Sequence, residues 1–270
     1  LKKVSEEGLG LGDIRILTTD INRYGFLFKS TFNKLGIDLF LDERKLLSQS
    51  RMIKSVLSLL KVFLRGFRRV DVLSYLKSSV HRELEEKLDT FENYLLSQGV
   101  LDFKEDVPFF HEDMEELRRL WITPLLKKAS LFKDKRSIRE FSESFLELLI
   151  SLEYPEKIQE EQARFHELDL LEEELIMAQA WNTLYEILMQ LRILSDDEPI
   201  NYKDFKTILE RAITDATIGI IPPSEGKVVL AEVHRTTHQV CKVLYFSGMN
   251  EHFRLPSRFW RKRPCLPFSR

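Results

Sequence analysis

Patterns typical of β-strands occur only near the two ends of the chain, and a long helical stretch separates them. Asp13–Thr18 and Ile37–Leu41 are short β-rich runs on the amino-terminal side. Lys227–Val233 and Lys242–Ser247 are nearly continuous apolar runs, which are typical of strands buried on both faces of a parallel sheet. Two strands at either end are too few to be stable alone, so we expect all of them to share one sheet.

A helix is expected between the first two strands. Asp20 can accept hydrogen bonds from the opening amides of this helix, and Gly36 suits the left-handed residue that ends it. Apolar side chains that recur every three or four residues should share one face, namely those of Tyr24, Leu27, Phe28, Phe32 and Leu35. Strand, crossover helix and strand form a βαβ unit, which implies a parallel sheet with helices packed on it.

The middle of the chain reads as helical throughout. From about Glu43 to Arg211, Leu, Glu, Lys and Arg dominate, and breaks in the helical period predict roughly seven helices. No breaker occurs between Pro155 and Leu194, which predicts one long or kinked helix with a solvated acidic face. The expected fold class is α/β, a parallel-sheet domain interrupted by a large all-α insertion. Residues 1–65 and 215–270 would form the discontinuous α/β domain, and residues 66–214 the helical insertion.

Composition limits the setting and the partners. The chain holds 41 Lys and Arg against 43 Asp and Glu, a net charge of −2, so nucleic-acid binding would need a local patch. Cys241 and Cys265 are too few for a disulfide framework or a four-cysteine zinc site, and they favour a cytoplasmic protein. The apolar runs are too short to span a membrane, so we expect no membrane association. Because the first residue is Leu1, we expect a fragment of a longer protein.

No residue pattern for catalysis stands out. The sequence lacks the Gly-x-x-x-x-Gly-Lys-Ser/Thr loop that cradles nucleotide phosphates, and Gly8–Gly12 precedes a strand instead of following one. His234 and His238 beside Cys241 could face a metal at helical spacing, but polar loop histidines are the simpler interpretation. We therefore expect no catalytic residue, no metal site and no cofactor-binding site in this chain.

The carboxyl-terminal segment has the strongest local charge. After Glu251 the chain contains no acidic residue, and its basic residues interleave with aromatic ones. Basic side chains neutralise phosphates and aromatic rings stack on bases, so this segment is a candidate DNA contact. Its candidate DNA-binding residues are Arg254, Arg258, Arg261, Lys262 and Arg263. A tail that is unstructured or covered by a partner is an equally open interpretation. A second basic cluster, Lys61, Arg65, Arg68 and Arg69, is interpreted as the surface end of a helix.

Four stretches of the chain, through their order and spacing, carry a resemblance to known proteins: Asp13–Asp42, Val70–Ser78, Ile218–Thr237 and Val243–Pro256. The order of these parts resembles the second RecA-like domain of superfamily 1 helicases, in which a helical insertion interrupts the sheet. More closely, the chain resembles the B-subunit family of the AddAB (RexAB) helicase–nucleases.

The resemblance implies a RecA-like sheet that has lost the coupling of ATP to DNA. In active helicases of the superfamily an arginine follows the first strand, where this chain has Thr18 and Thr19. A Thr-x-His-x-x-Lys-Gly motif follows the later strand, where this chain keeps His234 but lacks the Lys-Gly pair. The parent protein would be one chain of an ATP-dependent helicase and exonuclease, a hydrolase, whereas this fragment would not itself be catalytic.

The same resemblance implies the partners. Proteins of this type use the helicase fold to hold or read single-stranded DNA in recombination and DNA repair, while a motor subunit completes the heterodimer. ATP, magnesium and an iron–sulfur cluster are associated with the family but would lie outside this chain.

Ligands bind beyond the carboxyl ends of the strands in open α/β sheets, so the loop after Val233 is the first place to expect DNA. Its candidate DNA-binding residues are His234, Arg235, Thr236, Thr237 and His238. Their hydroxyl, imidazole and guanidinium groups can donate to backbone phosphates. The competing hypothesis is a helical protein–protein interaction scaffold with no DNA role. Binding to single-stranded DNA that weakens steeply with salt would separate the two.

Overall fold

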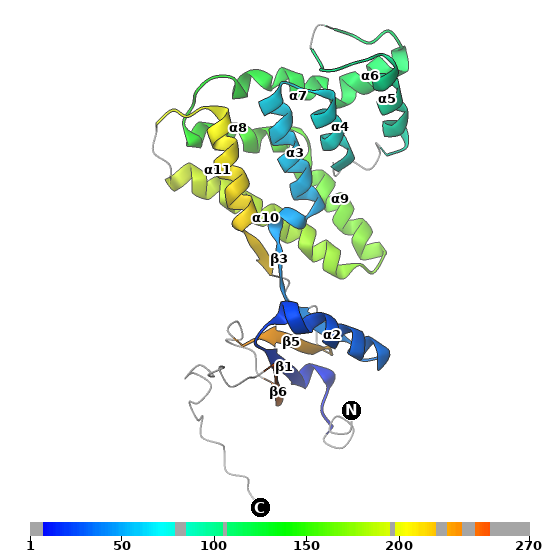
Figure 1. Ribbon diagram of the computed structural model, residues 1–270, viewed down its shortest axis with the longest axis vertical. Coiled ribbons are helices and arrows are strands. Elements are labelled where there is room, and N and C mark those ends of the chain that lie inside the picture. The colour runs from blue at the N-terminus through cyan, green and yellow to red at the C-terminus, as the bar shows by residue number, and fades with distance from the viewer. Residues whose placement is uncertain are drawn as a thin grey trace, which may run out of the picture. The chain divides into compact units, whose positions relative to one another are not determined.

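The computed structural model divides the chain into two compact units, which we call the sheet unit and the helical unit (Figure 1). The sheet unit comprises Leu1–Arg44 and Gly219–Arg270, and the helical unit comprises Lys45–Ile218. The structure describes residues 8–78, 85–104, 107–194, 198–219, 226–233 and 241–248.

The sheet unit is built on four parallel strands whose order mixes the two ends of the chain. They are β1 (Ile14–Thr18), β2 (Leu39–Asp42), β5 (Val228–Glu232) and β6 (Val243–Ser247), in the order β2-β5-β1-β6. Strand β5 comes after the whole helical unit in sequence but lies between β1 and β2, pairing in parallel with both. The two chain segments are therefore interdependent, and the expected α/β class with a shared parallel sheet is confirmed.

Helix α2 (Ile21–Lys34) packs on this sheet, and both of its expected ends are confirmed. The Asp20 carboxylate accepts a hydrogen bond from the Arg23 amide at 3.0 Å, and Gly36 adopts a φ of 65°. Phe28 and Phe32 pack against a small core formed by buried side chains of β1 and β5, namely Ile16, Val228 and Leu230.

The buried face of α2 differs from the expected one. Leu27 and Leu35 are exposed at 59% and 57%, whereas Ile21 and Gly25 are buried. Gly25 faces β2, because a Cβ atom there would meet the Leu41 side chain at 3.8 Å, an ordinary packing distance. The spacing of apolar residues did not indicate that this small residue lies on the packed face of α2.

The helical unit contains nine α-helices among the residues that the structure describes, where the sequence predicted roughly seven. They are α3 (Arg51–Arg65), α4 (Arg69–Ser78), α5 (Glu85–Ser97), α6 (Glu112–Trp121), α7 (Thr123–Lys127), α8 (Ile138–Ser151), α9 (Tyr154–Glu167), α10 (Leu171–Leu194) and α11 (Tyr202–Asp215). Two short strands, β3 (Arg44–Leu46) and β4 (Thr217–Gly219), pair where the chain enters and leaves this unit. No helix in the described ranges is long and apolar enough to cross a membrane.

The described boundaries of the units differ from the expected ones at 65/66 and 214/215. Helix α3 lies in the helical unit because its apolar face is completely buried there and packs most extensively against α4. The buried apolar residues of α3 are Met52, Ile53, Val56, Leu59, Leu60 and Val62.

Aromatic rings and buried hydroxyls join α3 to the later helices. The ring of Phe132 lies 5.0 Å from that of Tyr202, measured between centroids. The Tyr202 hydroxyl donates to the backbone carbonyl of Leu60 at 3.2 Å, and burial raises the pKa of that hydroxyl. Tyr154 pairs with the Ser55 hydroxyl at 2.5 Å, and burial raises its pKa to about 12. These contacts tie α9 and α11 to α3.

The prediction of one long or kinked helix over Pro155–Leu194 is wrong. The chain turns at Leu168–Leu170, and α9 and α10 pack against each other on either side of that turn. Asp169 sits in the turn with a φ of 56°, a left-handed conformation that Asp adopts more readily than most residues. The turn contains neither Gly nor Pro, so the usual breaker signals were absent.

Candidate nucleic-acid interface

The ten candidate DNA-binding residues all lie outside the described residues. They are His234, Arg235, Thr236, Thr237 and His238 after β5, and Arg254, Arg258, Arg261, Lys262 and Arg263 after β6. The described strand ends fix where the first of these segments begins. The Val233 amide donates to the Thr18 carbonyl at 3.0 Å, so the chain leaves β5 alongside the end of β1.

Three strand ends meet at one edge of the sheet because the strands are parallel. Thr18 at the end of β1 is in register with Glu232 of β5 on one side and Ser247 of β6 on the other. We call Thr18–Asp20, Glu232–Val233 and Ser247–Gly248 the carboxyl edge. Open parallel sheets bind ligands at this kind of edge, so it is the candidate site in the sheet unit.

The two threonines of the carboxyl edge are engaged within the fold. Thr18 is completely buried, and its hydroxyl oxygen accepts from the Asp20 amide at 3.4 Å. The Thr19 hydroxyl donates to the Gly248 carbonyl at 3.0 Å. The positions at which the family resemblance expects a nucleotide-contacting arginine therefore hold neutral groups that connect β1 to β6.

Protein carboxylates occupy the amino-terminal end of α2. Asp20 accepts from the Arg23 amide at 3.0 Å, and the Glu232 carboxylate accepts from the Ile21 amide at 3.3 Å. The free amides and the dipole at a helix start commonly attract phosphate. Here two negative side chains already accept from the Ile21 and Arg23 amides and would repel a further anion, which disfavours phosphate at this helix end.

Gly248 lies where the chain leaves β6, and it allows the backbone there to pass close to the start of α2. Its φ is 72°, and a Cβ atom there would lie 2.7 Å from the Tyr24 ring and 3.0 Å from the Thr19 hydroxyl oxygen. The Arg23 guanidinium lies 5.5 Å from the centre of the Tyr24 ring. Sequence reasoning placed Tyr24 on the core face of the helix and treated Gly248 only as the end of a strand. The signal for this contact was a glycine directly after an apolar run.

The opposite end of β6 carries a separate polar contact. The Lys242 ammonium lies 3.1 Å from the Asp13 carboxylate, and the Lys242 amide donates to the Asp13 carbonyl at 3.0 Å. The Gly10 amide and then Lys242 hold the pKa of Asp13 below its usual range. Cys241 next to Lys242 is a free, half-buried thiol. Within the described ranges no group of three or more His, Cys, Asp or Glu residues could hold a metal ion.

Two arginines of the basic cluster in the helical unit, Arg65 and Arg69, make contacts within the fold. Arg65 closes α3 and pairs with Asp71 at 3.2 Å. The Arg69 guanidinium donates to the carbonyls of Leu95 and Val100, at 3.4 and 2.9 Å, near the end of α5.

Known proteins resemble this chain over most of its length. No family model matches the chain. The B subunit of an ATP-dependent helicase/deoxyribonuclease from Clostridium botulinum (strain Loch Maree / Type A3) is 26% identical over 93% of the chain. Proteins of the same name from Clostridium novyi (strain NT) and Acetivibrio thermocellus are 28% and 24% identical, over 93% and 91% of the chain.

The chain spans about a quarter of the length of these relatives, 24% of the first and 23% of the other two. The matched region includes most of both units, because it covers more than nine-tenths of the chain. The resemblance seen in the sequence motifs is thus confirmed: this chain is homologous, across most of its length, to curated B subunits of ATP-dependent helicase/deoxyribonucleases.

Proposed function

We propose that the chain is the non-catalytic, helicase-like portion of a DNA-repair helicase–nuclease subunit, and that it holds or reads single-stranded DNA. The observation that carries this proposal is the similarity to helicase/deoxyribonuclease B subunits over 93% of the chain. The parallel sheet interrupted by a helical unit supports it, because this is the arrangement that the family resemblance implies.

The contacts at the carboxyl edge favour DNA binding by the loops that follow the strands over DNA binding by the start of α2. Asp20 and Glu232 occupy the start of α2, which leaves phosphate contact to the polar residues that follow β5. In sequence these are His234–His238, whose side chains offer hydrogen-bond donors. The basic residues after Glu251 extend the same proposal to the chain beyond β6.

The absence of catalysis is supported by the groups at the end of β1. A nucleotide would need cations near its phosphates, but Thr18 is buried and the Thr19 hydroxyl is bound to Gly248. The sequence also has no phosphate-binding glycine loop. We therefore assign ATP, magnesium and any iron–sulfur cluster to other parts of the parent protein or to its partner.

The partner that this proposal requires is a motor subunit in the cytoplasm. The relatives are named as subunits, which implies assembly with at least one other chain in those proteins. This chain would contribute to DNA handling, and its partner would supply the movement.

The test is the double variant Arg235→Ala with Thr236→Ala, studied in the intact protein by fluorescence anisotropy with labelled single-stranded DNA at several salt concentrations. Removing one phosphate contact reduces the salt slope by about 0.7, which corresponds to about fivefold weaker binding at 0.1 M salt. The matched control is Arg211→Ala with Thr207→Ala, two exposed residues of α11, which should leave affinity and slope unchanged.

Unchanged affinity and slope in the Arg235 and Thr236 variant would contradict the proposed DNA-binding loop. Indifference of the parent protein to DNA, combined with tight association with another protein, would instead support the scaffold hypothesis. That hypothesis has one structural observation in its favour, the exposure of large apolar side chains on the helical unit, such as Phe110 at 95%.

A further inference from the structure

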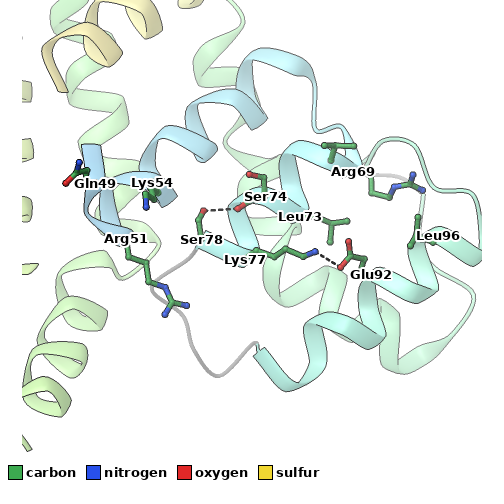
Figure 2. A pocket seen from close by; sticks show the side chains of 11 residues that line it. Gln49, Arg51, Lys54, Arg69, Leu73, Ser74, Lys77, Ser78, Glu92 and Leu96 are labelled. Atoms are coloured by element: carbon green, nitrogen blue, oxygen red, sulfur yellow. Dashed lines mark hydrogen bonds and ion pairs between the residues drawn. The ribbon is translucent and has the colours of Figure 1, made fainter. Parts of the chain in front are cut away.

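The helical unit contains an open groove of about 800 Å³ between the start of α3, α4 and α5 (Figure 2). It is lined by Gln49, Arg51, Lys54, Arg69, Val70, Leu73, Ser74, Lys77, Ser78, Glu92 and Leu96. All of these residues are part of the helical unit, so the described lining of the groove lies within one compact body. Sequence patterns did not reveal it, because its walls come from separate helices.

The groove is strongly positive although the chain as a whole is slightly negative. Arg51 and Lys54 from α3 and Arg69 and Lys77 from α4 line it, against a single carboxylate, Glu92 of α5. Lys77 and Glu92 form an ion pair with a separation of 2.6 Å, drawn as a dashed line in Figure 2. Since the whole chain has a net charge of −2, this concentration of positive charge is a local feature.

Contacts within the fold hold part of this charge in place. Arg69 is fixed by its donations to the carbonyls of Leu95 and Val100, and Lys77 is fixed by Glu92. Lys54 is exposed, and its ammonium forms no ion pair with any residue that the structure describes. Arg51 stands one helical turn before Lys54, so the two project from neighbouring positions on α3.

The chemistry of the lining matches phosphate oxygens, which only accept hydrogen bonds. The guanidinium and ammonium groups are donors, and the one carboxylate is already paired with Lys77. No aromatic ring is among the described residues that line the groove, so they offer no platform on which bases could stack. The walls are helices, which leaves no strand edge for pairing with an extended peptide.

We propose that this groove binds the phosphate backbone of single-stranded DNA without regard to sequence, as a contact separate from the carboxyl edge. The inference rests on the proposed function, because that function supplies the polyanion. It adds a second point of attachment, on the helical unit, whose contribution is electrostatic. Reading of a base sequence would be the task of other residues, since contacts to phosphates carry no sequence information.

The test is Lys54→Ala and Lys54→Glu in the intact protein, with anisotropy of labelled single-stranded DNA of several unrelated sequences. We expect Lys54→Ala to weaken binding about fivefold at 0.1 M salt and to reduce the salt slope by about 0.7, equally for every sequence. Lys54→Glu should weaken binding further. The matched controls are Lys61→Ala and Lys61→Glu, at an exposed lysine of the same helix that does not line the groove.

Ala is a better helix former than Lys, so Lys54→Ala should fold normally, which circular dichroism will verify. If the parent protein binds DNA and the Lys54 variants bind it equally well, the proposal that the groove binds DNA is overturned, and the proposed function stays intact. A parent protein that binds no single-stranded DNA would overturn both. Equal losses of DNA affinity in the Lys54 and Lys61 variants would also overturn the proposed groove contact, because they would indicate a general effect of positive charge on the protein surface. Binding of poly-glutamate that depends on Lys54, with DNA binding unaffected, would reassign the groove to an acidic protein segment.

Discussion

The stability of the helical unit should depend on pH through Glu115, a buried residue in the first turn of α6. Its carboxylate accepts from the Arg118 guanidinium at 2.6 and 2.9 Å, from Arg119 at 3.0 Å and from the Phe109 amide at 2.8 Å. The Arg118 hydrogen bonds, followed by those from Phe109 and Arg119, lower the pKa of Glu115 from 4.5 to about 2. The side chains of Glu115 and Arg118 are only 8% and 6% exposed, so solvent screens this pair weakly.

The magnitude follows from linkage between protonation and folding. A folded-state pKa below the unfolded value stabilises the fold at pH above about 4.5, and this contribution is lost as the pH falls towards 2. The whole shift corresponds to about 3 kcal/mol, of which about 2 kcal/mol is lost by pH 3. Glu115→Gln cannot titrate, so its stability should lack this part of the acid dependence and should be about 3 kcal/mol lower at pH 7.

The assay is urea unfolding of parent and variant at pH 7, 5, 4 and 3, followed by the helical circular dichroism signal. Comparison of the two proteins removes the contribution of every other carboxylate. The gap between their free energies of unfolding should narrow by about 2 kcal/mol between pH 7 and pH 3. A constant gap across this range would refute the reasoning, because the pair would then contribute only packing and not charge. Glu116→Gln, at an exposed neighbour on the same helix, is the matched control.

Substitutions at three further positions test local features of the two units. Gly248→Ala should destabilise the sheet unit by at least about 1–2 kcal/mol, because Gly248 has a left-handed conformation, and the overlap of the new Cβ atom with Tyr24 should add to this cost. The hydrogen-exchange rate of the β6 amides should therefore rise. An unchanged exchange rate would contradict the close approach of Gly248 to Tyr24. Asp20→Ala should cost about 1 kcal/mol through loss of the α2 cap, whereas Asp20→Asn should restore most of it in thermal unfolding. Asp169→Gly should stabilise the α9–α10 turn by about 0.5–1 kcal/mol because Gly adopts its φ of 56° without strain, so a lower melting temperature would count against the described turn.

The fold was predictable where its signals are local. Asp20 and Gly36 mark the ends of α2, and each apolar run at the chain ends became a strand of the parallel sheet. The position of β5 between β1 and β2 was not predictable, because strand order is set by pairing between segments far apart in the sequence. The turn at Asp169 was not predicted for a different reason, because its left-handed residue is not a glycine.

The candidate site was predictable only in part. Strand ends located the carboxyl edge, and family resemblance singled out Thr18 and Thr19 there, but neither revealed their contacts with Asp20 and Gly248. The ten candidate DNA-binding residues stay predictions, because the structure does not describe them. The groove at Lys54 depends on three helices meeting in space, and no single stretch of sequence encodes such a meeting.

The central place of β5 also dictates an order of events during protein synthesis. Among the described strands, β2 pairs in the sheet only with β5, so β1, α2 and β2 cannot complete their sheet when they leave the ribosome. At ~5–20 residues per second, residues 43–227 take roughly 10 to 40 seconds to follow. The helical unit can form its own core in that interval, whereas the apolar edges of β1 and β2 wait for their partner. A ribosome that stalls within the helical unit would therefore expose a strand–helix–strand segment prone to aggregation, and this segment is the one that a chaperone would need to protect.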